Sequence, residues 1–140
     1  MSAQLPPGTV IAYDYLWRWQ RDRGEMEGRK ERPACVAISV LHPRTNLTHL
    51  VLLAISKQPP RDPSDALEIP EIECRRGGLS DLRRAWITIS EYNYDIAETS
   101  FYLHPDQPPL GRFGRSFMKQ VAMAIAPMLK KAGARIDRLD

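Results

Sequence analysis

Two apolar segments separated by a short turn most strongly constrain how this chain folds. Residues 33–41 (PACVAISVL) and 47–56 (LTHLVLLAIS) are rich in β-branched and other apolar side chains, which favour strands. Pro33 suits the first position of a strand, where its missing N–H is not needed. The intervening residues 42–46 (HPRTN) contain proline and asparagine, which are typical of turns. The pattern therefore predicts a β-hairpin.

Composition and alternation predict further elements along the chain. Residues 20–31 form a charged loop with two glycines, and residues 57–65 hold three prolines and are expected to be a loop. Leu79–Leu82 is expected to be one helical turn capped by Ser80. Four other segments are predicted to be strands, the second of them a short edge strand: residues 9–19, 66–70, 85–93 and 99–104.

The C-terminal part of the chain changes to a helical period. Phe117, Val121, Ile125 and Met128 recur at helical spacing and predict an amphipathic helix that Pro127 kinks. We therefore expect a mainly β protein, a small, strongly bent antiparallel sheet or barrel with one C-terminal helix packed on it. The 140 residues are expected to form a single domain, residues 1–140.

Charge and cysteine content limit the environment and the partners. Twenty basic residues face seventeen acidic ones, so a polyanionic partner is permitted, and any basic patch must come from clustering. The two cysteines lack a CxxC spacing, which favours a reducing cytoplasm over a disulfide framework. The longest apolar run, residues 50–55, is far shorter than the roughly 20 residues of a membrane span, and the N-terminus lacks the pattern of a signal peptide. We expect a cytoplasmic protein without membrane association.

Several kinds of active site are not indicated by the sequence. His42, His49 and His104 are scattered and do not have the spacing of zinc ligands. There is no Walker loop, no GxGxxG and no GxSxG motif. We expect neither a metal nor a cofactor. Catalysis by this chain would rest on arginine, carboxylate and hydroxyl groups.

Three segments, in this order, resemble the PemK/MazF toxin family of type II toxin–antitoxin systems. The first is KERPACVAIS (residues 30–39), which follows Gly24-Glu25 and contains the Arg-Pro junction characteristic of the family. The second is VLLAIS (51–56), where the family's strand ends in a hydroxyl residue. The third is GGLSDLRRAWITISEYN (77–93), similar to the family's Gly-Leu followed by a strand with an acidic residue. Together with the C-terminal helix, the resemblance covers nearly the whole chain.

The resemblance implies a small SH3-like β-barrel of the CcdB/PemK/MazF type with a C-terminal helix, forming a homodimer. Usual members of the family are cytoplasmic toxins that act as metal-independent endoribonucleases on single-stranded RNA, and each is paired with an antitoxin protein. Two alternatives remain. The first is a non-catalytic member of the fold that acts by protein binding, as the related CcdB toxins do when they poison gyrase. The second is a nucleic-acid-binding domain without toxicity.

Carried over by position, the resemblance implies three catalytic residues. Arg32 matches the catalytic arginine, Ser56 stands where the family usually has threonine, and Glu91 stands where it usually has aspartate. Cleavage without a metal needs a base for the ribose 2′-OH and a cation for the phosphorane charge, and these residue types supply both. The chain departs from the family at Ala54, where a proline is usual, and at Ile89, where some members carry an additional arginine.

Further residues are candidates for RNA contact. The basic side chains would bind phosphates, and the aromatic and amide side chains would contact unpaired bases: Arg23, Arg29, Lys30, Lys57, Trp19, Tyr92 and Asn93. Non-catalytic interpretations also stay open. Arg32 could pair with Glu25 or Glu31 at the surface, Ser56 could be an ordinary strand-end hydroxyl, and Glu91 a solvated strand residue. Trp86 is expected in the core rather than as a platform for a base.

Overall fold

The central strand of the sheet is β3 (Leu47–Ser56), which hydrogen-bonds to neighbours on both of its edges. The computed structural model of the protein describes residues 5–28, 30–79, 83–104 and 106–139. Along one edge β3 pairs with β2 (Arg32–His42), through a turn in which Asn46 has a positive φ of 58°. Along the other edge it pairs first with β6 (Tyr92–Ile96) and then with β5 (Trp86–Thr88). The predicted hairpin is confirmed.

The remaining strands extend this sheet outwards. β1 (Thr9–Tyr13) pairs with β2, and the two-residue β7 (Gly111–Arg112) pairs with β1. β4 (Ala66–Glu68) lies at the opposite edge, as expected of a short edge strand, and pairs with β5. β8 (Arg135–Asp137) runs parallel to β6, whereas the other pairings are antiparallel. The protein is thus mainly β, and within the described residues the eight strands form one open sheet rather than a closed barrel.

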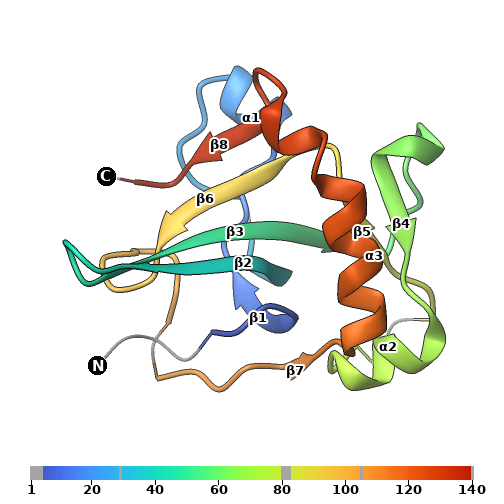
Figure 1. Ribbon diagram of the computed structural model, residues 1–140. Helices are drawn as coiled ribbons and strands as arrows, with labels where there is room; N and C mark the ends of the chain where they lie inside the picture. Colours follow the sequence, from blue (N-terminus) through green and yellow to red (C-terminus); the bar gives the residue numbers. More distant parts are fainter. Residues whose placement is uncertain (1–4, 29, 80–82, 105, 140) are drawn as a thin grey trace.

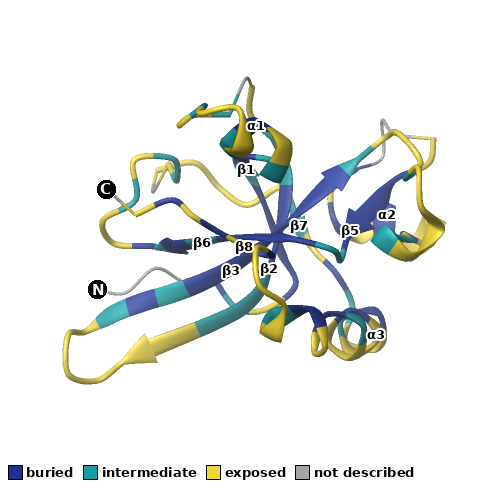
Figure 2. Cartoon of the chain, turned by 90° about the horizontal axis from the view of Figure 1, so that it is seen from above, coloured by how far each residue is buried: buried dark blue, intermediate teal, exposed yellow. Residues whose placement is uncertain are grey.

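Both faces of β3 are buried, so the sheet has a hydrophobic core on each side. Alternating β3 residues enter the two cores, one set being Val51, Leu53 and Ile55 and the other Leu50, Leu52 and Ala54. A strand that is buried on both faces has a continuous apolar sequence, which is the run seen at residues 50–55. Figure 2 shows the buried strands meeting at the centre and the exposed tip of the β2–β3 hairpin projecting from them.

The predicted C-terminal helix is α3 (Arg115–Ile125), which packs on one face of the sheet through Phe117, Val121 and Ile125. Figure 1 shows α3 at the end of the sheet opposite the hairpin tip. Pro127 does not kink α3 but ends it, because the chain continues as a separate 3₁₀ turn, η2 (Met128–Lys130).

A short helix that was not predicted, α2 (Glu71–Arg76), supports the start of α3. The buried carboxylate of Glu73 accepts a hydrogen bond from the Gly114 N–H (2.7 Å) and pairs with Arg76 (2.7 Å). The sequence carries a signal for α2, because Pro70 is followed by acidic residues in the first turn and arginines in the last turn. Residues 80–82 of the predicted helical turn lie outside the described residues.

The strand predicted over residues 9–19 is too long. β1 ends at Tyr13, and the chain turns because the Tyr15 N–H donates back to the Tyr13 carbonyl (3.0 Å). A short helix, α1 (Arg18–Asp22), then begins, and the buried Gln20 side chain accepts a hydrogen bond from the Trp17 N–H (2.9 Å). Local side-chain capping replaces the expected strand here.

Two other strand predictions are also corrected. Residues 85–93 form two strands rather than one, since the Ile89 N–H leaves the ladder and donates to the Asp65 carbonyl (2.8 Å). Residues 99–104 form no strand, because Ser100 is held in a turn by the carboxylate of Asp95 (2.6 Å). Glu91 lies in the break between β5 and β6.

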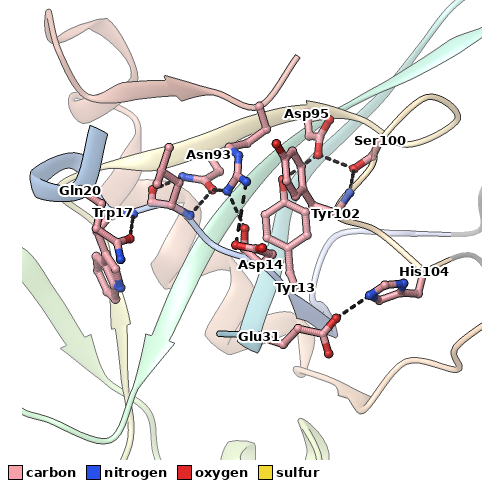
Figure 3. A network of polar contacts seen from close by, with 12 residues as sticks. Tyr13, Asp14, Trp17, Gln20, Glu31, Asn93, Asp95, Ser100, Tyr102 and His104 are labelled. Atoms are coloured by element: carbon pink, nitrogen blue, oxygen red, sulfur yellow. Dashed lines mark hydrogen bonds and ion pairs between the residues drawn. The ribbon is translucent and has the colours of Figure 1, made fainter. Parts of the chain in front are cut away.

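A buried polar network fastens the turn between β1 and α1 to β6 (Figure 3). The Asn93 amide is fully buried, accepts a hydrogen bond from the Leu16 N–H (2.9 Å) and donates one to the Leu16 carbonyl (2.7 Å). Arg138, which follows β8, donates to the carbonyl of Asp14 (2.5 Å) and also contacts Asn93 (3.3 Å). Long-range side chains therefore fix the path of the chain into α1.

Replacing Asn93 tests how much this network stabilises the fold. In Asn93→Ala the N–H and the carbonyl of Leu16 lose their buried partner, so we expect the free energy of unfolding to fall by about 2–4 kcal/mol. Urea unfolding monitored by circular dichroism measures the change. Gln120→Ala, which removes an exposed amide on α3, is the control and is expected to change stability by less than about 0.5 kcal/mol. Equal stability of the two variants would contradict this role of Asn93.

Candidate functional site

Arg32 and Ser56 lie at adjoining ends of two paired strands. β2 begins at Arg32, and β3 ends at Ser56. The antiparallel ladder of β2 and β3 ends at the pair Ala34 and Ala54, and Arg32 and Ser56 each lie two residues beyond it. Arg32 pairs with Tyr13 of β1, and both Arg32 and Ser56 line one hollow of the surface. The resemblance had assigned both residues to one site, and the sheet places them at one edge.

The Arg32 side chain carries a charge that no acidic group compensates within the described part of the chain. Its guanidinium lies 5.1 Å from the centre of the Trp17 ring, and its Nε is buried without a hydrogen-bond partner. Glu31, one of the acids proposed to neutralise it, instead contacts the His104 ring (2.5 Å; Figure 3). Burial lowers the pKa of Arg32 from its ordinary value. The surface ion pair considered from the sequence does not form among the described residues.

Glu91 is not a solvated strand residue, since only 7% of it is exposed. One carboxylate oxygen, Oε2, accepts a hydrogen bond from the Arg18 N–H (2.9 Å) and another from the Tyr15 hydroxyl (3.3 Å). Burial raises the pKa of Glu91 above its ordinary value, and the hydrogen bond from Arg18 opposes this shift. A carboxylate with a raised pKa is better matched to proton transfer near neutral pH.

Aromatic contacts connect Glu91 with Arg32. Tyr15, which hydrogen-bonds to Glu91, packs edge to face on Trp17 with a distance of 5.0 Å between ring centres. Trp17 in turn lies beneath the Arg32 guanidinium. The arginine and the carboxylate are therefore attached to one aromatic wall, formed by the turn between β1 and α1.

Two hollows open beside this wall and share Ser56 and Gln58. The first, the cationic hollow, has a volume of about 530 Å³, and its charged lining residues are Lys30, Arg32, Lys57 and one acid, Glu31. The second, the aromatic hollow, has a volume of about 400 Å³. Its lining includes three tryptophans and two carboxylates: Trp17, Trp19, Trp86, Asp65 and Glu91. Positive charge on one side of Ser56 and aromatic rings on the other suit a nucleic-acid strand that crosses the rim.

The predicted RNA-contacting residues lie in different surroundings. Lys30 and Lys57 are exposed and line the cationic hollow, and Trp19, with 46% of its surface exposed, lines the aromatic hollow. Arg23 is exposed and stacks on Trp19 at 5.8 Å from the ring centre. Arg29 lies outside the described residues.

Tyr92 and Asn93 do not reach the surface as the proposed RNA contacts require. Tyr92 is 7% exposed and belongs to the core beneath α3. Asn93 is fully buried, and its amide is occupied by Leu16. Both residues lie in β6. The structure assigns them to packing and to positioning of the turn before α1.

The loop over residues 57–65, which holds three prolines, contributes to the site but was not predicted to do so. Gln58, Arg61 and Asp65 line the aromatic hollow together with Pro59 and Pro60. Trp86 is 8% exposed, as expected of a core residue, yet it also lines this hollow. The three prolines were a usable signal, because they stiffen a loop that holds polar side chains next to a strand end.

Comparisons with family models, with curated proteins and with solved structures find no match to this chain. In the described part of the chain no group of three or more histidine, cysteine, aspartate or glutamate residues is arranged to hold a metal ion. The helices of that part also include none with the length and apolar character needed to cross a membrane.

The raised pKa of Glu91 predicts a pH-dependent effect of Glu91→Gln. A carboxyl group whose pKa is higher in the folded than in the unfolded chain contributes most to stability below the unfolded value, and loses that contribution as pH rises through the folded value. Glutamine does not titrate, so the stability of Glu91→Gln relative to the wild type is expected to increase from about pH 4 to about pH 7. Urea unfolding across this range measures the difference, and a difference that is independent of pH would contradict the burial of Glu91 as a charged group.

Proposed function

We propose that the protein is a metal-independent endoribonuclease that cleaves single-stranded RNA at the rim between the two hollows. The observation that carries the proposal is the Arg32 guanidinium, which lines a hollow without an acidic partner among the described residues. A half-buried cation of this kind lacks a counter-ion. A backbone phosphate, which a guanidinium binds through two parallel N–H groups, would supply one.

The neighbouring groups support binding of a phosphate at this place. Lys30 and Lys57 line the same hollow and add positive charge. The Ser56 Oγ accepts a hydrogen bond from the Gln58 N–H (3.0 Å), and no described residue accepts the Ser56 hydroxyl proton. That proton is available for a phosphate oxygen. Arg32 and Ser56 would then hold the two non-bridging oxygens of one phosphate.

Glu91 has the properties of the base in this proposal. Its carboxylate takes the proton of the ribose 2′-OH, the 2′-oxygen forms a bond to phosphorus, and the bond from phosphorus to the 5′-oxygen breaks. The leaving 5′-oxygen takes a proton from water, and the products are a 2′,3′-cyclic phosphate and a 5′-hydroxyl. Arg32 stabilises the negative charge that develops on the phosphorane. Tyr15 and the Arg18 N–H hold the carboxylate in place.

The sequence resemblance extends the proposal to a biological role. Because segments 30–39, 51–56 and 77–93 resemble the PemK/MazF family, we assign the protein as the toxin of a type II toxin–antitoxin pair. It would act in the cytoplasm as a homodimer and would be inhibited by an antitoxin protein. The open sheet would be a variant of the SH3-like barrel of that family.

Cleavage of RNA in the presence of EDTA tests the activity. The wild-type protein is expected to cleave a mixed single-stranded RNA and to leave 2′,3′-cyclic phosphate ends. Arg32→Ala is expected to lower the rate by about 100-fold or more, because it removes the cation that faces the developing charge. Arg44→Ala, which removes an exposed arginine in the hairpin turn, is the matched control and should keep full activity. Undiminished cleavage by Arg32→Ala, or loss of wild-type cleavage with EDTA, would refute the proposal.

Expression in a bacterial host tests the role as a toxin. We expect growth arrest with the wild type and normal growth with Arg32→Ala at equal protein levels, since toxicity depends on cleavage. Toxicity that persists in Arg32→Ala but is lost on substitution of exposed residues of α3, such as Met123→Glu, would favour the alternative of a protein-binding poison. Absence of toxicity together with salt-sensitive RNA binding would favour a nucleic-acid-binding domain.

A further inference from the structure

The aromatic hollow has the size and lining of a site for a flat heterocycle. Its volume of about 400 Å³ lies in the range of small-molecule sites. Trp19 offers an exposed ring at its rim, and Trp17 and Trp86 contribute further aromatic surface. Unpaired bases are bound by proteins through stacking on aromatic rings and through hydrogen bonds to their Watson–Crick edges.

Asp65 supplies a hydrogen-bond acceptor that is fixed in position and unoccupied. Its main chain is held on both sides, since its N–H donates to the Asp62 carbonyl (2.9 Å) and its carbonyl accepts from the Ile89 N–H (2.8 Å). Asp65 lines the aromatic hollow, and its carboxylate makes no hydrogen bond or ion pair with any residue that the structure describes. Asp65 therefore presents two acceptor oxygens from a rigid backbone to whatever enters the hollow.

The other carboxylate of the aromatic hollow, that of Glu91, already accepts hydrogen bonds within the protein. Glu91 Oε2 is occupied by the Arg18 N–H and the Tyr15 hydroxyl. In the proposed function this group takes a proton from the ribose. Asp65 is thus the acidic residue of the aromatic hollow that can accept hydrogen bonds from a base.

We propose that the aromatic hollow binds a guanine base whose Watson–Crick edge is read by the Asp65 carboxylate. Guanine presents two parallel donors on this edge, the N1–H and the exocyclic N2 amino group, which match the two oxygens of a carboxylate. Adenine and cytosine each place an acceptor beside their amino donor, and uracil places its single donor between two acceptors. A carboxylate therefore favours guanine over the other three bases.

This inference rests on the proposed function, because it places guanine next to the scissile phosphate. Ser56 and Gln58 belong to both hollows, so a phosphate at Arg32 and a base beside Trp19 would flank the same rim. The nucleotide in the aromatic hollow would be an immediate neighbour of the cleaved bond. The cleavage site is then expected to contain guanosine.

Binding of uncleavable RNA tests the base preference independently of cleavage. The probes are short 2′-O-methylated oligouridines with one central guanosine, inosine, adenosine or cytidine, titrated against the full chain by fluorescence anisotropy. Inosine differs from guanosine only in the missing N2 amino group. We expect the guanosine probe to bind about tenfold more tightly than the inosine probe, the size of effect typical of one specific base contact.

Substitution of Asp65 connects the preference to this side chain. Asp65→Asn is expected to bind the guanosine and inosine probes with similar affinity, because an amide offers one acceptor and one donor. Asp106→Asn is the matched control, since it makes the same change of charge at an exposed residue that does not line the hollow. It is expected to keep the wild-type preference.

The possible results separate this inference from the proposed function. Equal binding of guanosine and inosine by the wild type, a preference that survives in Asp65→Asn, or failure of all probes to bind would overturn the guanine site. A guanosine preference that depends on Asp65, in a protein that does not cleave RNA, would confirm the site and refute the ribonuclease. Cleavage of RNA by a protein without any base preference would support the ribonuclease and refute the guanine site.

Discussion

The structure depends on β3 being paired on both edges and buried on both faces. Its edges pair with β2 on one side and with β6 and β5 on the other, and its side chains enter two separate cores. A strand with these constraints has one register, because a slip of one residue would exchange the two sets of buried side chains. The end of β3 is therefore fixed, and Ser56 with it.

The position of Arg32 follows from the same constraint. The pairing of β2 with β3 brings Arg32 and Ser56 to the same end of the two strands, and pairing with Tyr13 of β1 holds the Arg32 backbone. The Arg32 Nε is buried without a partner, which costs on the order of 1–3 kcal/mol in a folded protein. In the proposed function, a phosphate of the RNA would supply the counter-charge that Arg32 lacks among the described residues.

The aromatic wall is positioned by residues distant in the sequence. Asn93 binds the backbone of Leu16, and Glu91 accepts the N–H of Arg18, so β6 and the segment before it hold both ends of the turn that carries Trp17. Arg138 adds a bond to Asp14 from the far end of the chain. The contacts of Glu91 and Asn93 come from β6 and the segment before it, and β6 is itself paired with β3.

The parts of the fold governed by local pattern were predictable from the sequence. The hairpin of β2 and β3 and the helix α3 follow from composition and periodicity, and both were predicted within a few residues. The strand expected over residues 9–19 was too long, because local capping by Gln20 and the bond from Leu16 to Asn93 turn the chain after β1. The strand expected over residues 85–93 is two strands, because the Ile89 N–H bonds to the Asp65 carbonyl between them.

In the candidate site, too, positions within the strands could be predicted from the sequence, whereas contacts between distant segments could not. Arg32 and Ser56 were selected from a resemblance in the strands, and the sheet brings their positions together, while their chemical roles stay predictions. The burial of Tyr92 and Asn93 could not be predicted, because the sequence does not show that β8 pairs with β6 or that the Leu16 backbone binds the Asn93 amide. Asp65 was missed because the sequence does not show that its loop folds against Ile89 and lines the aromatic hollow.

The central claim, that Arg32 is held ready for a phosphate, is tested most directly by nuclear magnetic resonance of arginine side chains. The N–H signal of the Arg32 guanidinium, assigned by its loss in Arg32→Lys, would be followed while a 2′-O-methylated oligonucleotide is added. A saturable shift of this signal at the concentration at which the RNA binds, with the Arg44 signal unchanged, is the predicted result. Binding of the RNA without any change in the Arg32 signal would contradict the account.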